Sequence, residues 1–165
     1  MIKAKMSLMD KVMFGLGKCF KSEQKVKSNL VATLIGPDGL IKDIRTVHNT
    51  VTTAGKYGAA DQILASPSLT KPGWMEVGTG TGGTTKLNTY VADSRTALDS
   101  KTRSDAVVTM VCTFGAGVGT GALTEAGIFD VVTQDTANMW CYATFDVINK
   151  AAGDSLVVTW TLTYA

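Results

Sequence analysis

Three glycines give the chain its most suggestive chemical motif. Gly78, Gly80 and Gly83 satisfy the spacing G-x-G-x-x-G, which in dinucleotide-binding folds lets the backbone approach a pyrophosphate. That chemistry needs a helix directly after the glycines, because the helix N-terminus holds the phosphates. Residues 84–92 are rich in threonine and lack helical periodicity, and no G-K-S/T sequence of a P-loop follows. We therefore predict a flexible loop here and no cofactor.

The histidine and cysteine content limits other kinds of site chemistry. His48 is the only histidine, so a catalytic triad or a multi-histidine metal site would have to be built around it or without it. Cys19, Cys112 and Cys141 have no C-x-x-C spacing, which argues against a zinc site and a disulfide framework. We expect His48 to be structural or exposed, and Cys112 and Cys141 to pack in the core as small apolar side chains.

Carboxylates offer one further route to catalysis, because a pair of them can hydrolyse a glycosidic bond. Glu125 differs from the other candidates because it lies inside an otherwise apolar run, Leu123–Phe129. An unpaired buried carboxylate is costly, so we expect backbone amides, Arg95 or Arg103 to satisfy Glu125, and we assign it a structural role. Most of the remaining candidates are expected at turns or on the surface; they are Asp93, Asp99, Asp105, Asp130, Asp135, Asp146 and Asp154.

Length and composition fit one folded domain with a short appendage. The chain has 165 residues, of which 45% are hydrophobic and 18% charged, a composition that supports a packed core. Residues 1–27 hold seven lysines against Asp10 and Glu23, so the basic charge is concentrated in the appendage. No apolar run reaches the roughly 18 to 20 residues that span a bilayer, and no signal-peptide pattern is present. These features predict synthesis in the cytoplasm.

The appendage, residues 1–27, is predicted to be a basic amphipathic docking arm. Its apolar residues recur at spacings of three and four, which is typical of a helix, but Gly15 and Gly17 each cost about 1 kcal/mol of helix stability. A binding partner or the protein's own body must therefore stabilise it, and the pattern favours neither; attachment to a membrane surface ranks third. The predicted partner-binding residues are Met6, Met9, Met13, Leu16 and Phe20, with Lys3, Lys11 and Lys18.

The body, residues 28–165, begins with a predicted hairpin and a short helix. Alternating apolar residues from Val26 lead to the turn Gly36–Gly39, and a return strand is expected over Leu40–Val51. A helix capped by Thr53 is expected from Ala54 to about Ala65, before Pro67. Its side chains available for packing are Tyr57, Ile63 and Leu64.

Most of the remaining chain has the period-two pattern of β-strands. Val107–Phe114 and Leu156–Tyr164 each alternate apolar residues with threonine or valine, which predicts one buried face. Met139–Ile148 carries apolar residues on both faces, so we expect both to be at least partly covered. Trp74–Val77 is a further predicted strand, and Gly115–Gly121 and Gln134–Asn138 are predicted connections. The fold class is mainly β: an antiparallel β-sandwich, jelly-roll-like, with an N-terminal helical arm and one short body helix.

Five ordered segments resemble one family, the virion structural proteins of tailed bacteriophages. The likeness spans about residues 28–164, and the order of the segments is more specific than any one of them. The resemblance implies a non-enzymatic protein of the head decoration, head fibre or tail fibre type, assembled in symmetric copies, with a trimer preferred. The segments are VHNTVTTAGK (Val47–Lys56), WMEVGTG (Trp74–Gly80), LTEAGIFD (Leu123–Asp130), ATF (Ala143–Phe145) and DSLVVTWTLT (Asp154–Thr163).

The chain is short, has no fibrous repeat and carries one basic arm, so among these types we favour a capsid decoration or cement protein. Its expected partner is the major capsid protein or another virion protein, with no specific nucleic acid and no membrane. The alternative is a tail fibre or tail-tip protein that contacts the host surface, in which case the loops Gly78–Gly83 and Gly115–Gly121 are candidate contacts. A capsule-degrading hydrolase ranks third. The expected location is the virion, on the capsid surface by preference and on the tail as the alternative.

Overall fold

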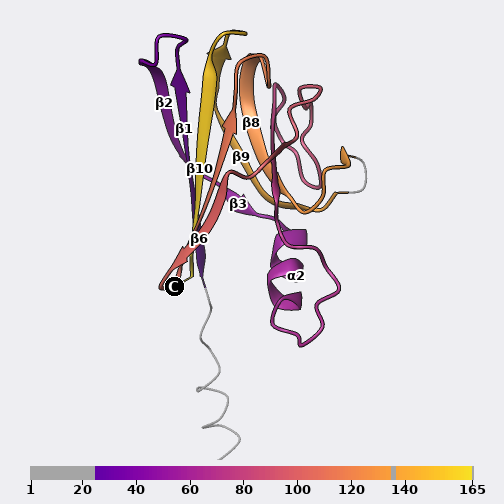
Figure 1. The fold of residues 1–165 in the computed structure, drawn as a ribbon. Helices are drawn as coiled ribbons and strands as arrows, with labels where there is room; N and C mark the ends of the chain where they lie inside the picture. The colour runs from indigo at the N-terminus through magenta and orange to yellow at the C-terminus, as the bar shows by residue number, and fades with distance from the viewer. Residues whose placement is uncertain (1–24, 135–136, 165) are drawn as a thin grey trace, which may run out of the picture.

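The computed structural model describes residues 25–134 and 137–164, and they form a mainly β protein (Figure 1). Residues 1–24 of the predicted arm, with all eight of its proposed binding residues, lie outside the described residues, whereas Val26 and Lys27 belong to the first strand of the body. One helix of the described part, α2, lies between β3 and β4. The strands are β1 (Val26–Ile35), β2 (Ile41–His48), β3 (Thr50–Val51), β4 (Trp74–Gly78), β5 (Thr96–Ala97), β6 (Ser100–Ser104), β7 (Val107–Phe114), β8 (Gly121–Phe129), β9 (Met139–Lys150) and β10 (Ser155–Tyr164).

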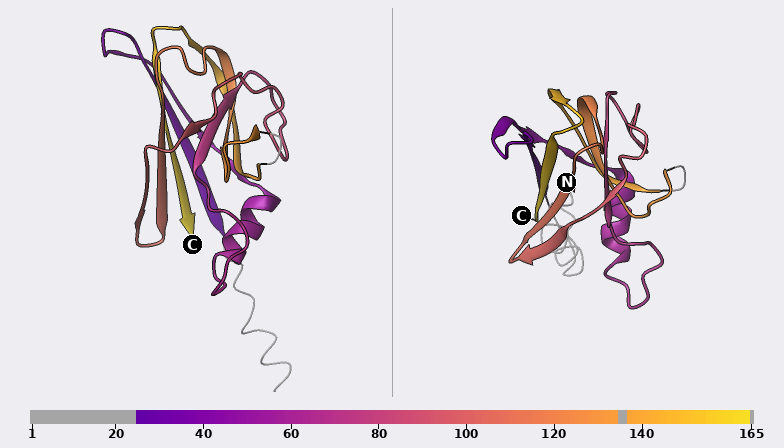
Figure 2. Two further views of the ribbon diagram at one scale, coloured as in Figure 1. Left: turned by 45° about the vertical axis from the view of Figure 1, so that its right-hand side comes forward. Right: turned by 45° about the horizontal axis from the view of Figure 1, so that its top comes forward.

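The strands form two five-stranded antiparallel sheets that share one apolar core. We call them sheet A, in the order β2-β1-β10-β7-β6, and sheet B, in the order β3-β9-β8-β4-β5. Figure 2 shows the two layers, with β1 and β10 in one and β8 and β9 in the other. Buried residues of both sheets belong to the same cluster, which includes Leu30, Phe114 and Trp160 from sheet A and Ile128 and Ile148 from sheet B. The predicted mainly β, antiparallel architecture is confirmed.

Sheet A follows the sequence pattern closely. In β10 the side chains of Leu156, Val158, Trp160 and Leu162 are buried, as the alternation predicts, whereas Tyr164 at the strand end is exposed. The indole N–H of Trp160 is also hydrogen-bonded in the core, because Nε1 donates to Ser28 Oγ at 3.0 Å. The C-terminal strand is therefore a central part of the core.

In β9 residues on both faces are buried, which confirms the sequence prediction, but the alternation changes phase near the end of the strand. Ala143 and Phe145 are buried as expected, but Val147 is exposed and Ile148 is buried instead. The cause is an irregular register: Glu125 of β8 pairs with Thr144, but Leu123, two residues earlier, pairs with Ile148. β9 has three residues between these two pairs and β8 has one, so the regular ladder is interrupted here, and the side chains of β9 change phase within this irregular stretch.

The predicted return strand is two strands in two different sheets. The turn at residues 36–39 leads into β2, an edge strand of sheet A, which ends at His48. After Asn49 the chain crosses to sheet B, where Thr50 and Val51 pair with β9. The irregular spacing of apolar residues over Leu40–Val51 reflects this crossing, because the two halves face the core from different sheets.

The body helix, α2 (Thr53–Asp61), begins and ends earlier than the sequence suggests. Its cap is Thr52, whose Oγ1 accepts the Gly55 amide at 3.0 Å, so the prediction of Thr53 as the cap is wrong. Thr52 is better placed because its hydroxyl also donates to the Met139 carbonyl of β9, which ties the helix to sheet B. Within the described residues, no helix is long and apolar enough to cross a membrane.

Candidate functional sites: a carboxylate cradle, ion pairs and apolar surfaces

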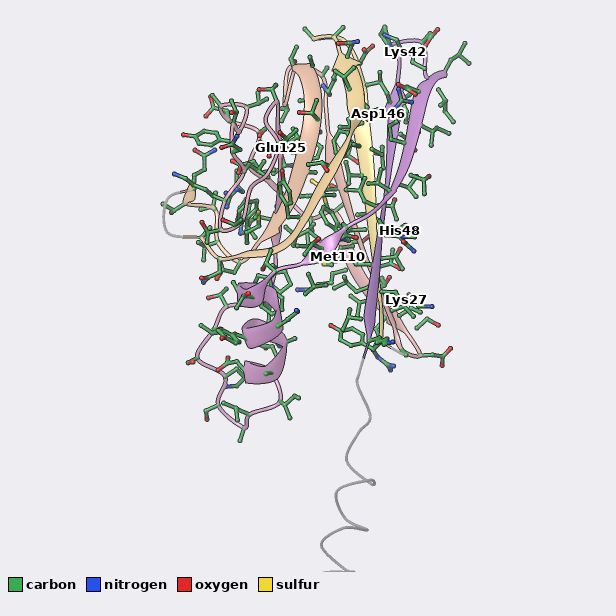
Figure 3. The ribbon with its side chains drawn as sticks, turned by 180° about the vertical axis from the view of Figure 1, so that it is seen from behind. Lys27, Lys42, His48, Met110, Glu125 and Asp146 are labelled. Atoms are coloured by element: carbon green, nitrogen blue, oxygen red, sulfur yellow. The ribbon has the colours of Figure 1, made fainter. Side chains whose placement is uncertain are left out.

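Glu125 of β8 is fully buried and holds the loop between β4 and β5 against sheet B. Its Oε1 accepts the amides of Thr89 at 2.9 Å and Gly80 at 3.2 Å. Its Oε2 accepts the Tyr142 hydroxyl at 2.9 Å and the Asn88 amide at 3.3 Å. The expectation that backbone amides satisfy this carboxylate is confirmed, and neither arginine proposed as a partner forms a hydrogen bond with it. Figure 3 places Glu125 among the loop segments beside β8.

The glycine motif has its explanation in this cradle. A Cβ atom at Gly78 would lie 2.6 Å from Glu125 Oε1, and one at Gly80 would lie 2.8 Å from the same oxygen. Successive glycines therefore let the backbone close around a carboxylate, as they do around a phosphate in nucleotide-binding loops. Here the anion is a side chain of the protein itself, and no helix follows the motif. The rejection of a dinucleotide-binding turn is consistent with this geometry.

A second buried carboxylate, Glu76 of β4, pairs with Arg95. Arg95 Nη2 donates to Glu76 Oε2 at 2.9 Å, and both side chains are almost completely buried. Arg95 Nη1 donates to the Val131 carbonyl at 2.8 Å, and its guanidinium lies 3.6 Å from the centre of the Phe129 ring. Gln134 donates to the other Glu76 oxygen. The sequence analysis missed Glu76, although it carries the same signal as Glu125, an acid between apolar neighbours in a strand.

The third polar site lies at the β9–β10 turn, close to the tip of the β1–β2 hairpin. Asp154 Oδ2 accepts a hydrogen bond from Lys42 Nζ at 2.8 Å and another from the Ala151 amide at 3.0 Å. These contacts lower the pKa of Asp154 below its ordinary value, and the hydrogen bond from Lys42 has the largest effect. Lys150 is also buried and donates to the carbonyls of Gly115 and Asp154, and its burial lowers the pKa of its ammonium group. This cluster joins three turns of the fold.

The histidine and the two described cysteines occupy positions where a structural role is sufficient. His48 is exposed at the end of β2, with its Nδ1 2.6 Å from Asn29 Oδ1. Cys112 and Cys141 are buried free thiols, and burial raises the pKa of each to about 12, so neither supplies a thiolate near neutral pH. Among residues 25–134 and 137–164, no three His, Cys, Asp or Glu side chains lie together as a metal site would need.

Exposed apolar side chains gather on α2 and the segment that follows it. Tyr57 is 68% exposed and Ile63 is 85% exposed, and Leu64 and Leu69 are also exposed. The expectation that Tyr57, Ile63 and Leu64 pack inside the body is therefore wrong. The buried face of α2 is formed by Gly55 and Gly58, which rest on Trp140, so the larger side chains are left outward. Tyr57 and Leu69 line a small cavity of about 180 Å³ together with Trp140.

The chain was compared with known proteins at three levels. No protein-family model, no curated protein and no solved structure matches it.

Proposed function

We propose that the chain is a structural component of a tailed-bacteriophage virion, most specifically a capsid decoration or cement protein. The resemblance of five ordered segments to phage virion proteins is the starting point. The structural observation that carries the proposal is an apolar surface, Tyr57 to Leu69, at the end of the molecule where the basic arm joins the body. Large apolar side chains that are exposed together on a folded domain often mark a contact with another macromolecule.

The start of β1, which follows the arm in the sequence, and the apolar surface lie at the same end of the fold. The arm precedes Val26, the first residue of β1, and Val26 pairs with Tyr164 at the far end of sheet A from the β1–β2 turn. Figures 1 and 2 show α2 at this same end, beside the start of β1 and the C-terminus. A partner that binds the arm is therefore within reach of α2. The lysines of the arm would meet an acidic surface, while apolar residues of the arm and of α2 fill a groove.

This arrangement suits a protein that spans neighbouring capsid subunits and resists the pressure of packaged DNA. Its partner would be the major capsid protein or another virion protein. We also propose assembly in symmetric copies, with a trimer preferred, and a jelly-roll-like relation between the two sheets. The adjacency of the first and last strands, β1 and β10, within sheet A supports the jelly-roll-like arrangement, and the β8–β9 hairpin within sheet B departs from it.

The docking surface can be tested with full-length variants and purified mature heads. Ile63→Asp combined with Leu64→Asp changes exposed side chains of the apolar surface, and Met9→Asp combined with Met13→Asp changes the arm. We expect each pair to reduce occupancy on heads at least tenfold. Val147→Asp is the matched control, because Val147 is an exposed valine of β9, outside both surfaces, and should leave binding unchanged. Deletion of residues 1–22 should abolish docking. Full occupancy by both double variants would contradict the proposal.

The position on the particle is best established by electron cryo-microscopy of purified virions, with this protein identified in the map. Density repeated over the capsid lattice would support a head role and give the copy number. Density confined to the neck, tail or fibres would overturn the decoration proposal and favour the alternative, a tail fibre or tail-tip protein. In that case the loop Gly115–Gly121 would be the next segment to change.

A further inference from the structure

The outer face of sheet A, the face turned away from sheet B, carries little charge; Lys27, which pairs with Thr163 at the start of β1, is a charged residue on it. The register aligns its side chains in rows across the strands: Val31 pairs with Thr159, which pairs with Val111. The next row is formed by Asn29, Thr161 and Thr109. Threonine and valine also occupy most of the equivalent positions in the other rows of β1, β10 and β7. All of these side chains are half-buried by their neighbours in the sheet.

The two edge strands, β2 and β6, both contain charged residues. In these strands, the charged residues that pair with the neighbouring strand are absent from the positions that face outward. In β2, Asp43 and Arg45 pair with Leu34 and Ala32, whose side chains point toward the core. In β6, Lys101 and Arg103 likewise pair with positions of β7 that face the core side. Because side chains alternate along a strand, the charges of both edges share the core-facing phase, and uncharged residues take the outer phase.

Exposed isoleucines extend the outer face along the β2 edge. Ile44 is 50% exposed and pairs with Thr33 of the outer face, and Ile41 is 61% exposed and pairs with Ile35. Isoleucine on a solvated edge strand invites association, and natural proteins usually place charges there. The outer face of sheet B is built differently: a loop and α2 cover part of it, and its open part includes Thr144 and Asp146.

We propose that the outer face of sheet A binds a second copy of this chain. Depletion of charge is the compositional signature of the centre of a protein interface, and a neutral face is complementary to another neutral face. The same face on a second copy is equally neutral. A symmetric contact requires a surface that is complementary to itself, and this face meets that requirement. Two sheets packed in this way would place the β-branched side chains of each between those of the other, about 10 Å apart.

The size of the outer face of sheet A is sufficient for binding a second copy of the chain. Five strands at about 4.8 Å spacing and roughly eight residues at about 3.3 Å each give a projected area of about 600 Å². Side chains make the accessible area larger than this projection, which brings it close to the roughly 800 Å² per partner of a standard stable interface. The contact lies on sheet A and not on α2, so self-association and docking on a capsid are separate properties of the protein.

The test is the mass of the full-length protein in solution, measured by sedimentation equilibrium over a range of concentrations. Two identical faces packed on each other close a dimer, so we expect the wild type to show twice 17.4 kDa and not the mass of the trimer that the resemblance implies. Thr161→Lys places a charge in the middle of the face and should weaken association at least tenfold, giving the 17.4 kDa species. Thr144→Lys adds the same charge to an exposed threonine of the other sheet and should assemble as the wild type does. Circular dichroism checks that each variant is folded.

Thr109→Glu, on the neighbouring strand, provides the same measurement with a charge of opposite sign, and it replaces Thr161→Lys if that variant does not fold. A monomeric wild type would overturn the inference, as would assembly of both face variants at wild-type strength. Dissociation by Met9→Asp with Met13→Asp, combined with intact assembly of Thr161→Lys, would assign self-association to the arm and also overturn it. The docking variants of α2 should remain assembled, so failure of the capsid proposal and failure of this one give different results.

Discussion

Tyr142 of β9 donates a hydrogen bond to Glu125 of β8, with 2.9 Å between the hydroxyl and Oε2. The pair lies under the loop that leaves β4, and the same carboxylate accepts three amides of that loop. Burial is the first cause that raises the pKa of Tyr142, and the hydrogen bond to Glu125 adds to it. One carboxylate therefore fixes a loop that has few apolar anchors, the main one being Leu87 beside Phe129 and Met139.

Replacement of Glu125 by glutamine should destabilise the fold. The NH2 group of glutamine donates hydrogen bonds and cannot accept them, so the two donors at one of the carboxylate oxygens would face another donor. We expect a loss of about 1.5 to 3 kcal/mol in the free energy of unfolding, measured by urea denaturation. Asp146→Asn is the control, because Asp146 is an exposed acid of β9. A Glu125→Gln variant as stable as this control would show that the cradle contributes little.

The contact between Gly58 and Trp140 predicts an unusual effect of alanine. Alanine favours a helix over glycine by about 1 kcal/mol, so Gly58→Ala should stabilise α2 if only helix propensity counted. A Cβ at Gly58, however, would overlap the indole ring of Trp140. We expect a net destabilisation of about 1 to 3 kcal/mol from overpacking, together with a change in tryptophan fluorescence.

Gly73 provides the matched control for this substitution. A Cβ there would meet no atom closer than 3.9 Å, so Gly73→Ala should be neutral or slightly stabilising. Equal stability of the Gly58 and Gly73 variants would show that α2 moves away from Trp140 without cost. In that case the helix would be a loosely attached element of the fold.

The sequence predicted the three central strands of sheet A, β1, β10 and β7, well, because one covered face gives a regular alternation; it did not predict the edge strand β6. It failed where the answer depends on the partner strand: the phase change before Val147 comes from the register between β8 and β9. The cap of α2 was misplaced by one residue because Thr52 and Thr53 are equivalent in sequence, and only contact with β9 distinguishes them. The outward position of Tyr57 likewise follows from the two glycines on Trp140, a contact between distant residues.

The polar sites were likewise predictable only in part. Burial of Glu125 was predictable from its apolar neighbours, and so was its need for hydrogen-bond donors. The partners were not predictable, because Gly80 and Thr89 reach the carboxylate from a loop about 40 residues earlier in the chain. Glu76 and Arg95 show the same limit: their pairing across 19 residues depends on how the loop between β4 and β5 returns to the sheet.

The raised pKa values of Cys112 and Cys141 predict that both thiols are unreactive in the folded protein. With a pKa of about 12, less than about one thiol in a thousand is ionised at pH 8. We expect both to resist alkylation by iodoacetamide at pH 8 and to react within minutes in denaturant. Peptide mapping by mass spectrometry distinguishes each of them from Cys19. Rapid labelling of Cys141 in the folded state would show that sheet B opens locally.

The ion pair of Asp154 with Lys42 predicts a loss of stability in acid. The folded-state pKa of Asp154 lies below its ordinary value, so the unfolded chain binds a proton more readily than the folded one. The contribution of Asp154 is therefore fully present above the ordinary pKa of about 4, and it is lost as the pH falls from there through the lowered folded-state value. Asp154→Asn cannot titrate, and it should have a lower melting temperature than the wild type at pH 6.

The difference in melting temperature between the wild type and Asp154→Asn should then shrink steadily as the pH is lowered below about 4. Asp38→Asn is the control, because Asp38 is an exposed acid in the nearby β1–β2 turn and lacks a lysine partner in the described structure. Its difference from the wild type should stay small across the same range. If the Asp154→Asn difference did not change with pH, the contact with Lys42 would not be an ion pair that stabilises the turns.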